Sequence, residues 1–455
     1  MCCCKGEVSL PKLPSCPPEQ EAYWVGQTDA AKEFRRNARA YNSALSFSSQ
    51  GAKIELPFLG GVQVLRINGA ASHKLGPLIP NAGYQPSFAQ LHIIDSDYAL
   101  RRRQEIFPAR ANSAPVLRPG ILTVFQNSLL RHNPYVHMFH QAGRAMAHQY
   151  AAQIQAARDQ GVPVPDNVPN VVLELMAPVG PEENDPRRYN LPTDQNEVAA
   201  FIPESVLAGP DTGVATHRDI KVKLINGTLK SLPNTSPHLD PLRYPLLFPT
   251  GAPGWGLQMP LRPPGHIPLD QHEAYWQTKK RQNMTLLQYN AYRLMSREGD
   301  PPQIFRGGRL FQEYLVDAYG RIESNRLHYI RDQQKKLRAD TYRGLADAVE
   351  AGDHDRGRIG LKIILPSTFT GGPRYMQQAC ADTIAVCTKY GKPDAFITMT
   401  CNPYWPEIRA ELLPHQQPSD RPDLCARVFN LKRKALMEDL KKGEVLGKVV
   451  AYLFV

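Results

Sequence analysis

Two histidines in the first half of the chain have a spacing that could serve metal binding. His137 and His140 lie three residues apart in a stretch with helical character, so both would face one side of a helix. Imidazole nitrogens placed in this way can ligate a metal ion. No third ligand follows at a recognisable spacing, and this favours histidines that face solvent or the core.

Basic residues are concentrated after residue 270. Residues 271–345 contain 14 Lys or Arg and 8 Asp or Glu, and their pattern predicts a helical array. Five basic residues lie near Tyr329 in the sequence: Arg326 before it, and Arg331, Lys335, Lys336 and Arg338 after it. Of these, Arg331, Lys335 and Arg338 would share one helix stripe. Cations that reach phosphates bind DNA without sequence preference, so the cluster is a candidate single-stranded DNA site. A solvated helix face is the alternative.

A second candidate phosphate contact is the glycine pair Gly371-Gly372, which precedes Pro373 and Arg374. Proline is favoured in the first turn of a helix, and the free N–H groups of that turn can bind a phosphate. A glycine pair alone is a weak signal. Arg374 is therefore a candidate DNA-binding residue mainly because of its place at this helix start.

The eight cysteines indicate a reducing, intracellular compartment, because disulfide-stapled secreted domains are shorter and denser in cysteine. Cys2, Cys3 and Cys4 lack a His or Cys partner at zinc-finger spacing. They could be the end of a metal site or an exposed N-terminal cluster. Cys380 and Cys387 repeat at helical spacing, which favours core positions for both.

Composition places the chain among globular proteins and suggests four regions. It has 455 residues, a net charge of +11 and 41 prolines, about twice the usual share of about 5%. No apolar run approaches the ~18 residues of a membrane span. The regions are a proline-rich lead-in with the Cys cluster (1–30), a mixed α/β region (31–160), a proline-rich β/loop region (161–270) and a final domain (271–455). Within the second region, Ala89–Ile94 has the pattern of a strand.

The last 95 residues predict alternating strands and helices. Leu361–Leu365, Ala395–Thr400 and Lys448–Val455 have strand patterns, and helices are expected after Gly372 and over Pro422 to Lys442. The expected fold class is therefore α/β (α+β), with a sheet flanked by helices at the C-terminus. Because Val449–Val455 is a buried-strand pattern with no turn after it, we expect the chain to be a fragment.

Several long strings in the second half of the chain are specific enough to point to a family. They are GGPRYMQQ (Gly371–Gln378), YGKPDAFITMTCNPYWPEI (Tyr390–Ile408), RPDLCARVFNLK (Arg421–Lys432) and GKVVAYLFV (Gly447–Val455). These strings resemble the N-terminal Rep-type region of Helitron transposases, often called the Helitron helicase-like domain. Further matches are Glu33–Lys53, His238–Trp255 and Arg309–Asp340, so the resemblance covers most of the chain.

The resemblance implies the fold and chemistry of rolling-circle replication initiators. It implies an antiparallel sheet flanked by helices, incomplete in this chain, and a His-apolar-His pair that binds Mg or Mn in the full-length family. It also implies one or two tyrosines that attack a DNA phosphate. The first strand motif of that fold corresponds to Ala395–Thr400, with Phe396, Ile397, Thr398 and Thr400 as its motif residues.

The chain departs from this family at the residues that carry the chemistry. No two of its thirteen histidines are two apart, and none of its nineteen tyrosines has a partner four residues on. It also lacks a GxxxxGK[ST] phosphate loop, the nearest approaches being Gly443–Val449 and Tyr390–Lys392. We therefore expect no catalytic residues, no metal or other cofactor, no strand cleavage and no ATP hydrolysis in this chain.

Two functions remain. The first is a fragment of a Helitron rolling-circle transposase, catalytically inactive, that keeps single-stranded DNA binding. The alternative is a non-catalytic interaction or scaffold protein derived from a transposon. The resemblance implies a nuclear location, and no membrane partner is expected.

Overall fold

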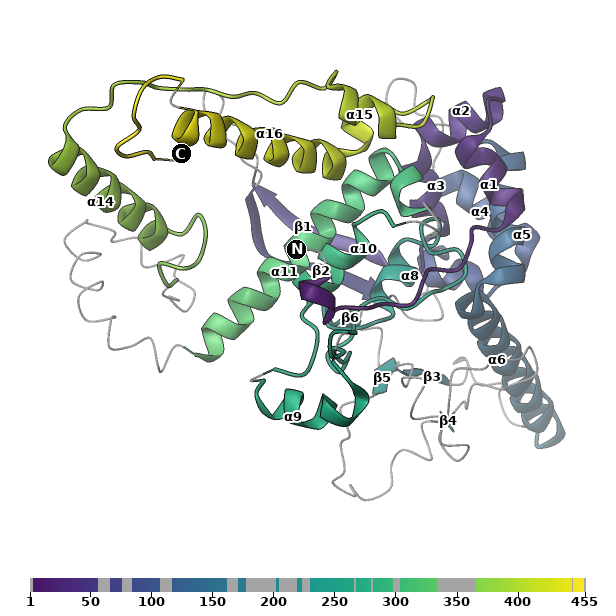
Figure 1. The fold of residues 1–455 in the computed structure, drawn as a ribbon. Helices are drawn as coiled ribbons and strands as arrows, with labels where there is room; N and C mark the ends of the chain where they lie inside the picture. Colours follow the sequence, from purple (N-terminus) through teal and green to yellow (C-terminus); the bar gives the residue numbers. More distant parts are fainter. Residues whose placement is uncertain are drawn as a thin grey trace. The chain divides into compact units, whose positions relative to one another are not determined.

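The computed structural model describes residues 3–55, 66–75, 84–106, 117–161, 171–176, 202–203, 219–222, 230–265, 267–279, 281–297, 303–333, 365–443 and 445–453. The chain divides into two compact units, Met1–Arg321 and Ile322–Val455, whose elements are labelled in Figure 1. None of the described helices is long and apolar enough to cross a membrane.

Proline and side-chain caps fix the starts of these helices. Proline occupies the first turn of α1 (Pro18–Val25), α5 (Pro119–His132) and α6 (Pro134–Asp159), where its missing N–H costs no hydrogen bond. The hydroxyl of Thr28 accepts a hydrogen bond from the N–H of Ala31 and so caps α2 (Asp29–Arg36). Only Asn37 separates α2 from α3 (Ala38–Leu45).

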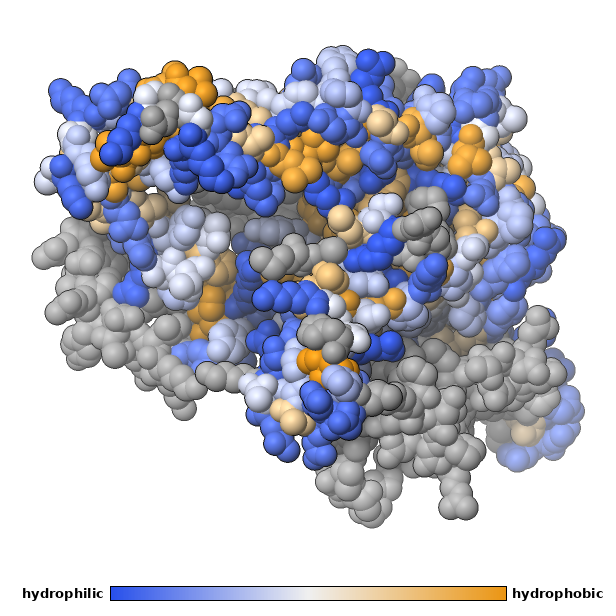
Figure 2. All heavy atoms as spheres, viewed as in Figure 1, coloured by the Kyte–Doolittle hydropathy of each residue, from blue (hydrophilic) through white to orange (hydrophobic). Residues whose placement is uncertain are grey.

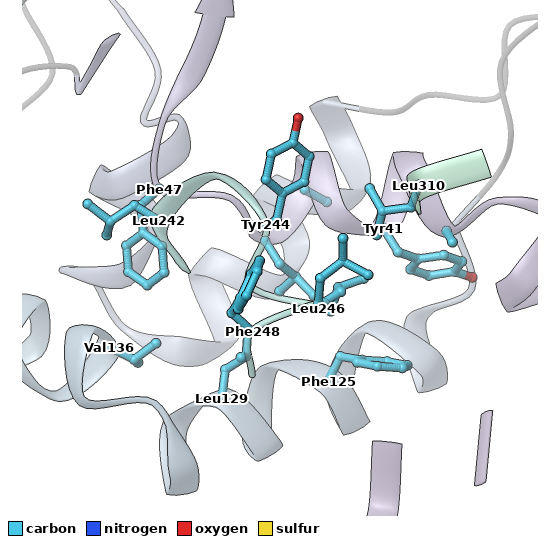
Figure 3. Close-up of a cluster of buried hydrophobic side chains, with 14 of the residues drawn as sticks. Tyr41, Phe47, Phe125, Leu129, Val136, Leu242, Tyr244, Leu246, Phe248 and Leu310 are labelled. Atoms are coloured by element: carbon cyan, nitrogen blue, oxygen red, sulfur yellow. The ribbon is translucent and has the colours of Figure 1, made fainter. Parts of the chain in front are cut away.

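An aromatic core joins these helices. The rings of Phe34 and Phe125 stack with centroids 4.4 Å apart, and Trp24 packs edge-on against Phe34 at 4.7 Å. Figure 3 shows Tyr244 and Phe248, from the segment that follows α8 (Leu239–Arg243), on the same core as Phe125. Each such buried ring contributes about 1.5–3 kcal/mol to folding. The core therefore unites segments about 200 residues apart in the sequence.

The expected strand at Ala89–Ile94 is instead the 3₁₀ helix η2 (Phe88–His92). The side chains of Ser87 and Gln90 form a reciprocal capping box at its start. This local hydrogen bonding satisfies backbone groups that a strand would have to pair with a neighbour. The helix α4 (Ser96–Ile106) follows.

The N-terminal segment is tied to the later part of the first unit. The carboxylate of Glu7 accepts a hydrogen bond from Lys279 Nζ at 2.6 Å, and Arg293 Nη1 donates to the carbonyl of Pro11 at 2.7 Å. The remaining short helices of this unit are η1 (Cys4–Gly6), η3 (Leu269–Gln271), α9 (His272–Gln277), α10 (Leu286–Arg293) and η4 (Ile304–Arg306). The long helix α11 (Arg309–Asp332) begins in this unit and continues into the second.

Six short strands are described, all before residue 233, and they form two small antiparallel sheets. One has the order β1-β2-β6, with Ile54 of β1 opposite Ile67 of β2 and His73 of β2 opposite Leu232 of β6. The other has the order β4-β3-β5, with Leu173 of β3 opposite Val222 of β5. Their bounds are β1 (Ser49–Glu55), β2 (Arg66–Leu75), β3 (Val171–Met176), β4 (Ile202–Pro203), β5 (Asp219–Val222) and β6 (Lys230–Leu232).

The described part of the second unit is helical. It contains the end of α11, then α14 (Pro373–Tyr390), α15 (Pro406–Glu411), η6 (Pro418–Asp420) and α16 (Pro422–Lys442). The expected helices after Gly372 and over Pro422 to Lys442 are confirmed, since Gly372 is the N-cap of α14 and Pro422 begins α16.

The expected α/β fold class is wrong, because the described fold is predominantly helical and its C-terminal part contains no strand. Residues 395–400 and 448–453 are neither helix nor strand. A strand requires neighbouring N–H and C=O groups to complete its ladder, and no described element pairs with these two segments. Of the other expected strand, Leu361–Leu365, only Leu365 lies within the described residues.

Candidate nucleic-acid interface

The last turns of α11 present exposed basic and aromatic side chains. Arg326 and Arg331 are exposed, and Tyr329 between them is 67% exposed, whereas Ile330 is buried. At 3.6 residues per turn, Arg326 and Tyr329 lie about 60° apart around the helix axis. Arg326 and Arg331 lie about 140° apart. The structure therefore places Arg326 beside Tyr329 on one face and Arg331 on another.

The rest of the predicted basic cluster cannot be placed in this way. Lys335, Lys336 and Arg338 lie outside the described residues. The stripe of Arg331, Lys335 and Arg338 therefore stays a prediction. Within the described part of the helix, Glu323 is exposed three residues before Arg326, so the face around Tyr329 carries both signs of charge.

The start of α14 has the backbone that its sequence predicts. Gly371 adopts a left-handed conformation, with φ of +80°, which a residue with a Cβ rarely takes. Gly372 then caps a helix of 18 residues, and Pro373 occupies its first turn. Arg374, in that first turn, is half-buried. The N–H groups of this turn are the donors that a phosphate would use.

The four motif residues of the expected first strand lie on an extended, unpaired segment. Phe396 is 90% exposed and Ile397 49%, and Thr398 and Thr400 are also exposed. Their side chains therefore face solvent in the described fold. The tyrosine that follows, Tyr404, is 74% exposed, which removes it from the core and leaves its ring accessible to a base.

Three basic side chains of α16 are engaged in ion pairs. Lys432 Nζ lies 2.5 Å from a carboxylate oxygen of Glu407 and 5.9 Å from the ring centroid of Trp405. The hydrogen bond from Lys432 lowers the pKa of Glu407. Arg427 binds the carboxylate of Asp423 at 3.0 Å, and Lys442 binds Glu438 at 2.6 Å. These pairs reduce the charge that the helix can offer to a phosphate.

One contact of the C-terminal segment was not apparent from the sequence. Lys441 Nζ lies 3.6 Å from the ring centroid of Tyr452, a close cation–π contact. The two residues are 11 positions apart in the sequence, with Lys441 in α16 and Tyr452 in the segment after it. Only the path of the chain after α16 brings them together.

The described residues contain no group of three or more His, Cys, Asp or Glu side chains that could hold a metal ion. His137 and His140 both lie on α6, as predicted. Burial lowers the pKa of His140, and the nearby Arg144 lowers it further. Cys2 is outside the described residues, whereas Cys3 and Cys4 are free and half-buried, and Cys4 Sγ accepts a hydrogen bond from Gln288 at 3.5 Å.

Polar residues of the string His238–Trp255 form hydrogen bonds and ion pairs in the interior of the first unit. Tyr135 and Nδ1 of His238 are hydrogen-bonded at 2.7 Å, and Asp240 forms a buried ion pair with Arg321 of α11. Two further bonds join the same elements: Arg243 to Glu313 at 2.8 Å and Tyr244 to Asp317 at 3.2 Å. This string therefore positions the first half of α11.

Comparison with known families supports the resemblance seen in the sequence. Residues 289–455 match the family model described as "Helitron helicase-like domain at N-terminus". The resemblance is thereby confirmed for this part of the chain, which carries a Helitron helicase-like domain and includes α11, α14 and α16. The match suggests a Helitron transposon-derived protein. No curated protein matches the chain.

Proposed function

We propose that this chain is part of a Helitron rolling-circle transposase that binds single-stranded DNA but does not cut it on its own. The observation that carries the proposal is the exposed pair Arg326 and Tyr329 at the end of α11, within the matched domain. Residues three apart on a helix are neighbours, with Cβ atoms about 5–6 Å apart. The arginine can contact a phosphate while the tyrosine ring stacks on the adjacent base.

Three other features support a nucleic-acid surface in the same unit. Arg331 offers a second cation on α11, and Tyr404 offers another exposed ring. The first turn of α14 offers backbone N–H groups beside Arg374. These contacts involve phosphates and base faces, so the binding is expected to have little sequence preference.

The first experiment measures binding of a fluorescent oligothymidine by anisotropy across a range of salt concentrations. A cation that contacts a phosphate of a single strand contributes about −0.7 to the slope of log affinity against log salt. We therefore expect Arg326→Gln to reduce the slope by about that amount. Tyr329→Ala should weaken binding by about 1–3 kcal/mol and leave the slope unchanged, because stacking releases no counterions.

Arg309→Gln is the matched control, since Arg309 is an exposed arginine at the other end of the same helix. It lies about 25 Å from Arg326 along the helix axis. The control should bind as the unchanged chain does. Equal effects of the two arginine substitutions, or no binding of the unchanged chain at low salt, would contradict the proposed surface.

The second experiment tests catalysis. The paired histidines that would hold Mg or Mn, the paired tyrosines and the phosphate loop are absent from the sequence. We therefore expect no nicking of single-stranded DNA with either metal and no ATP hydrolysis. A covalent protein–DNA adduct on a denaturing gel would show that the chain has a nucleophile that its motifs do not reveal.

A non-catalytic interaction protein is the second candidate, and the exposed apolar side chains of the second unit favour it. Among them, Phe396 is 90% exposed, Val450 64% and Ile384 60%. Apolar surface of this kind is commonly covered by another protein or another part of the same protein. Salt-dependent DNA binding separates the candidates, because a pure interaction protein would show none.

A further inference from the structure

Two cysteines from different segments of the second unit face the same shallow groove. Cys401 follows the extended motif segment, and Cys425 lies in the first turns of α16, 24 residues later. The side chains that line this groove are Met399, Thr400, Cys401, Cys425, Ala426 and Phe429. Apart from the hydroxyl of Thr400, the side chains of these residues consist only of sulfur and hydrocarbon.

Both thiols are free and half-buried. Cys425 Sγ donates a hydrogen bond to the carbonyl of Pro418 at 3.3 Å, which holds its side chain in place. Burial raises the pKa of Cys425, and the neighbouring Cys401 and Asp423 raise it further.

We propose that Cys401 and Cys425 form a reversible disulfide, and that this pair is a redox-sensitive modification site of the second unit. The proposal rests on the shared groove and on the partial exposure of both cysteines. A groove open to solvent admits a small disulfide oxidant such as oxidised glutathione.

The reaction consists of two thiol–disulfide exchanges. A cysteine thiolate of the pair attacks one sulfur of oxidised glutathione, which breaks its S–S bond, forms a mixed disulfide and releases one glutathione thiolate. The second cysteine loses its proton and attacks the protein sulfur of the mixed disulfide, which expels the second glutathione thiolate. Two protein thiols are thus oxidised while one glutathione disulfide is reduced to two thiols.

The disulfide would join the segment that precedes Tyr404 to the first turns of α16. It closes a loop that contains α15, whose residues already contact α16. Closing this loop restricts the conformations of the unfolded chain and of the segment itself. Oxidation should therefore fix the position of the motif segment relative to α16.

The test uses the full chain, reduced and then incubated with oxidised glutathione, followed by tryptic digestion without reductant. Arg409 lies between the two cysteines, so trypsin separates them unless they are joined. We expect a linked pair of peptides, one with Cys401 and one with Cys425, that mass spectrometry detects and that dithiothreitol removes.

Three substitutions serve as controls. Cys380→Ser removes an exposed cysteine of α14 and should leave the linked peptides unchanged. Cys401→Ser should abolish the linked species and leave Cys425 as a thiol or a glutathione adduct, and Cys425→Ser should do the reverse. If the unchanged chain gives only glutathione adducts at both positions, or joins either cysteine to other cysteines in equal amounts, the proposal is wrong. DNA binding is not part of this readout, so the result is independent of the proposed function.

Discussion

Arg103 is a charged residue enclosed within the first unit. Its guanidinium donates to the carbonyls of Ala44 at 3.0 Å and Leu91 at 3.2 Å, and to the side chain of Gln126. Burial lowers its pKa to about 9. These neutral acceptors replace the water that a guanidinium would otherwise bind, and they fix the path of three separate segments around one side chain.

His92 lies beside Arg103 and is held neutral. Its ring stacks on Phe47 with centroids 3.9 Å apart, and its Nε2 lies 3.0 Å from the carbonyl of Leu45. Burial lowers the pKa of His92 well below its usual value, and the charge of Arg103 lowers it further. A second positive charge at this place would be buried without a counterion among its described neighbours.

The neutral His92 predicts that acid destabilises the first unit. Its pKa is lower in the folded than in the unfolded chain, so the unfolded chain binds more protons below pH ~6.5. The free energy of unfolding should therefore fall as pH decreases below that value, by up to about 1.4 kcal/mol per pH unit for one histidine. Urea denaturation between pH 5 and 8 measures this slope.

Two substitutions apportion the effect. His92→Asn should reduce the slope of unfolding free energy against pH by the contribution of one proton. It should also lower stability at pH 8. His140→Gln should reduce the slope by a smaller amount, because the pKa of His140 is lowered less than that of His92. A slope that is unchanged in both variants would place the acid sensitivity at other groups.

At the scale of elements, a row of polar contacts joins α8 and its following segment to the first half of α11. Asp240 and Arg321 are 1% and 2% exposed, so their ion pair is fully buried. Burial alone would lower the pKa of Arg321, but Asp240 and Asp317 outweigh it and raise the pKa. A Cβ at Gly254 would lie 2.4 Å from Asp240 Oδ2, so a larger residue there would force the Asp240 side chain to shift.

Removing one partner of this pair should be costly, because the other would remain as an unpaired buried charge. We expect Arg321→Met to lower the free energy of unfolding by about 3–5 kcal/mol. The double variant Asp240→Leu with Arg321→Met should lose less than the sum of the two single variants, since neither charge is then left alone. Additive losses in a double-mutant cycle would show that the two side chains do not interact.

At the scale of the whole molecule, the two units differ in how well they bury apolar side chains. The first has an extensive aromatic core, whereas the described part of the second buries only a few apolar side chains, among them Ile408 and Val428. Figure 2 shows apolar side chains at the surface over α16. One of them, Leu431 of α16, is 64% exposed. A surface of this kind favours association.

The exposed apolar side chains of the second unit should bind an apolar fluorescent dye and promote self-association. We expect the chain to enhance the fluorescence of anilinonaphthalene sulfonate and to form larger species as its concentration rises. Phe396→Lys with Val450→Lys should reduce both, because charges replace two of the most exposed apolar side chains. Lys32→Gln on α2 of the first unit is the control and should change neither. A monomer that binds no dye would contradict an accessible apolar surface.

Elements whose signals are local could be predicted from the sequence. Proline and glycine set the start of α14 and the extent of α16. The long motif strings pointed to the Helitron helicase-like domain, which the family model then matched over residues 289–455. Helices can be predicted in this way because their hydrogen bonds join residues four apart and their caps are adjacent. The helical position of Arg326 and Tyr329 belongs to this group, whereas the exposure of the Tyr329 ring was not predicted.

Features that depend on contacts between distant residues could be seen only in the folded structure. The pattern of Ala395–Thr400 favours a strand, yet a strand forms only where another segment supplies its hydrogen bonds, and the described fold supplies none there. The pairing of Asp240 with Arg321 and the groove shared by Cys401 and Cys425 join residues 81 and 24 apart, respectively. Sequence spacing cannot reveal such contacts, because the path of the chain between the partners determines them.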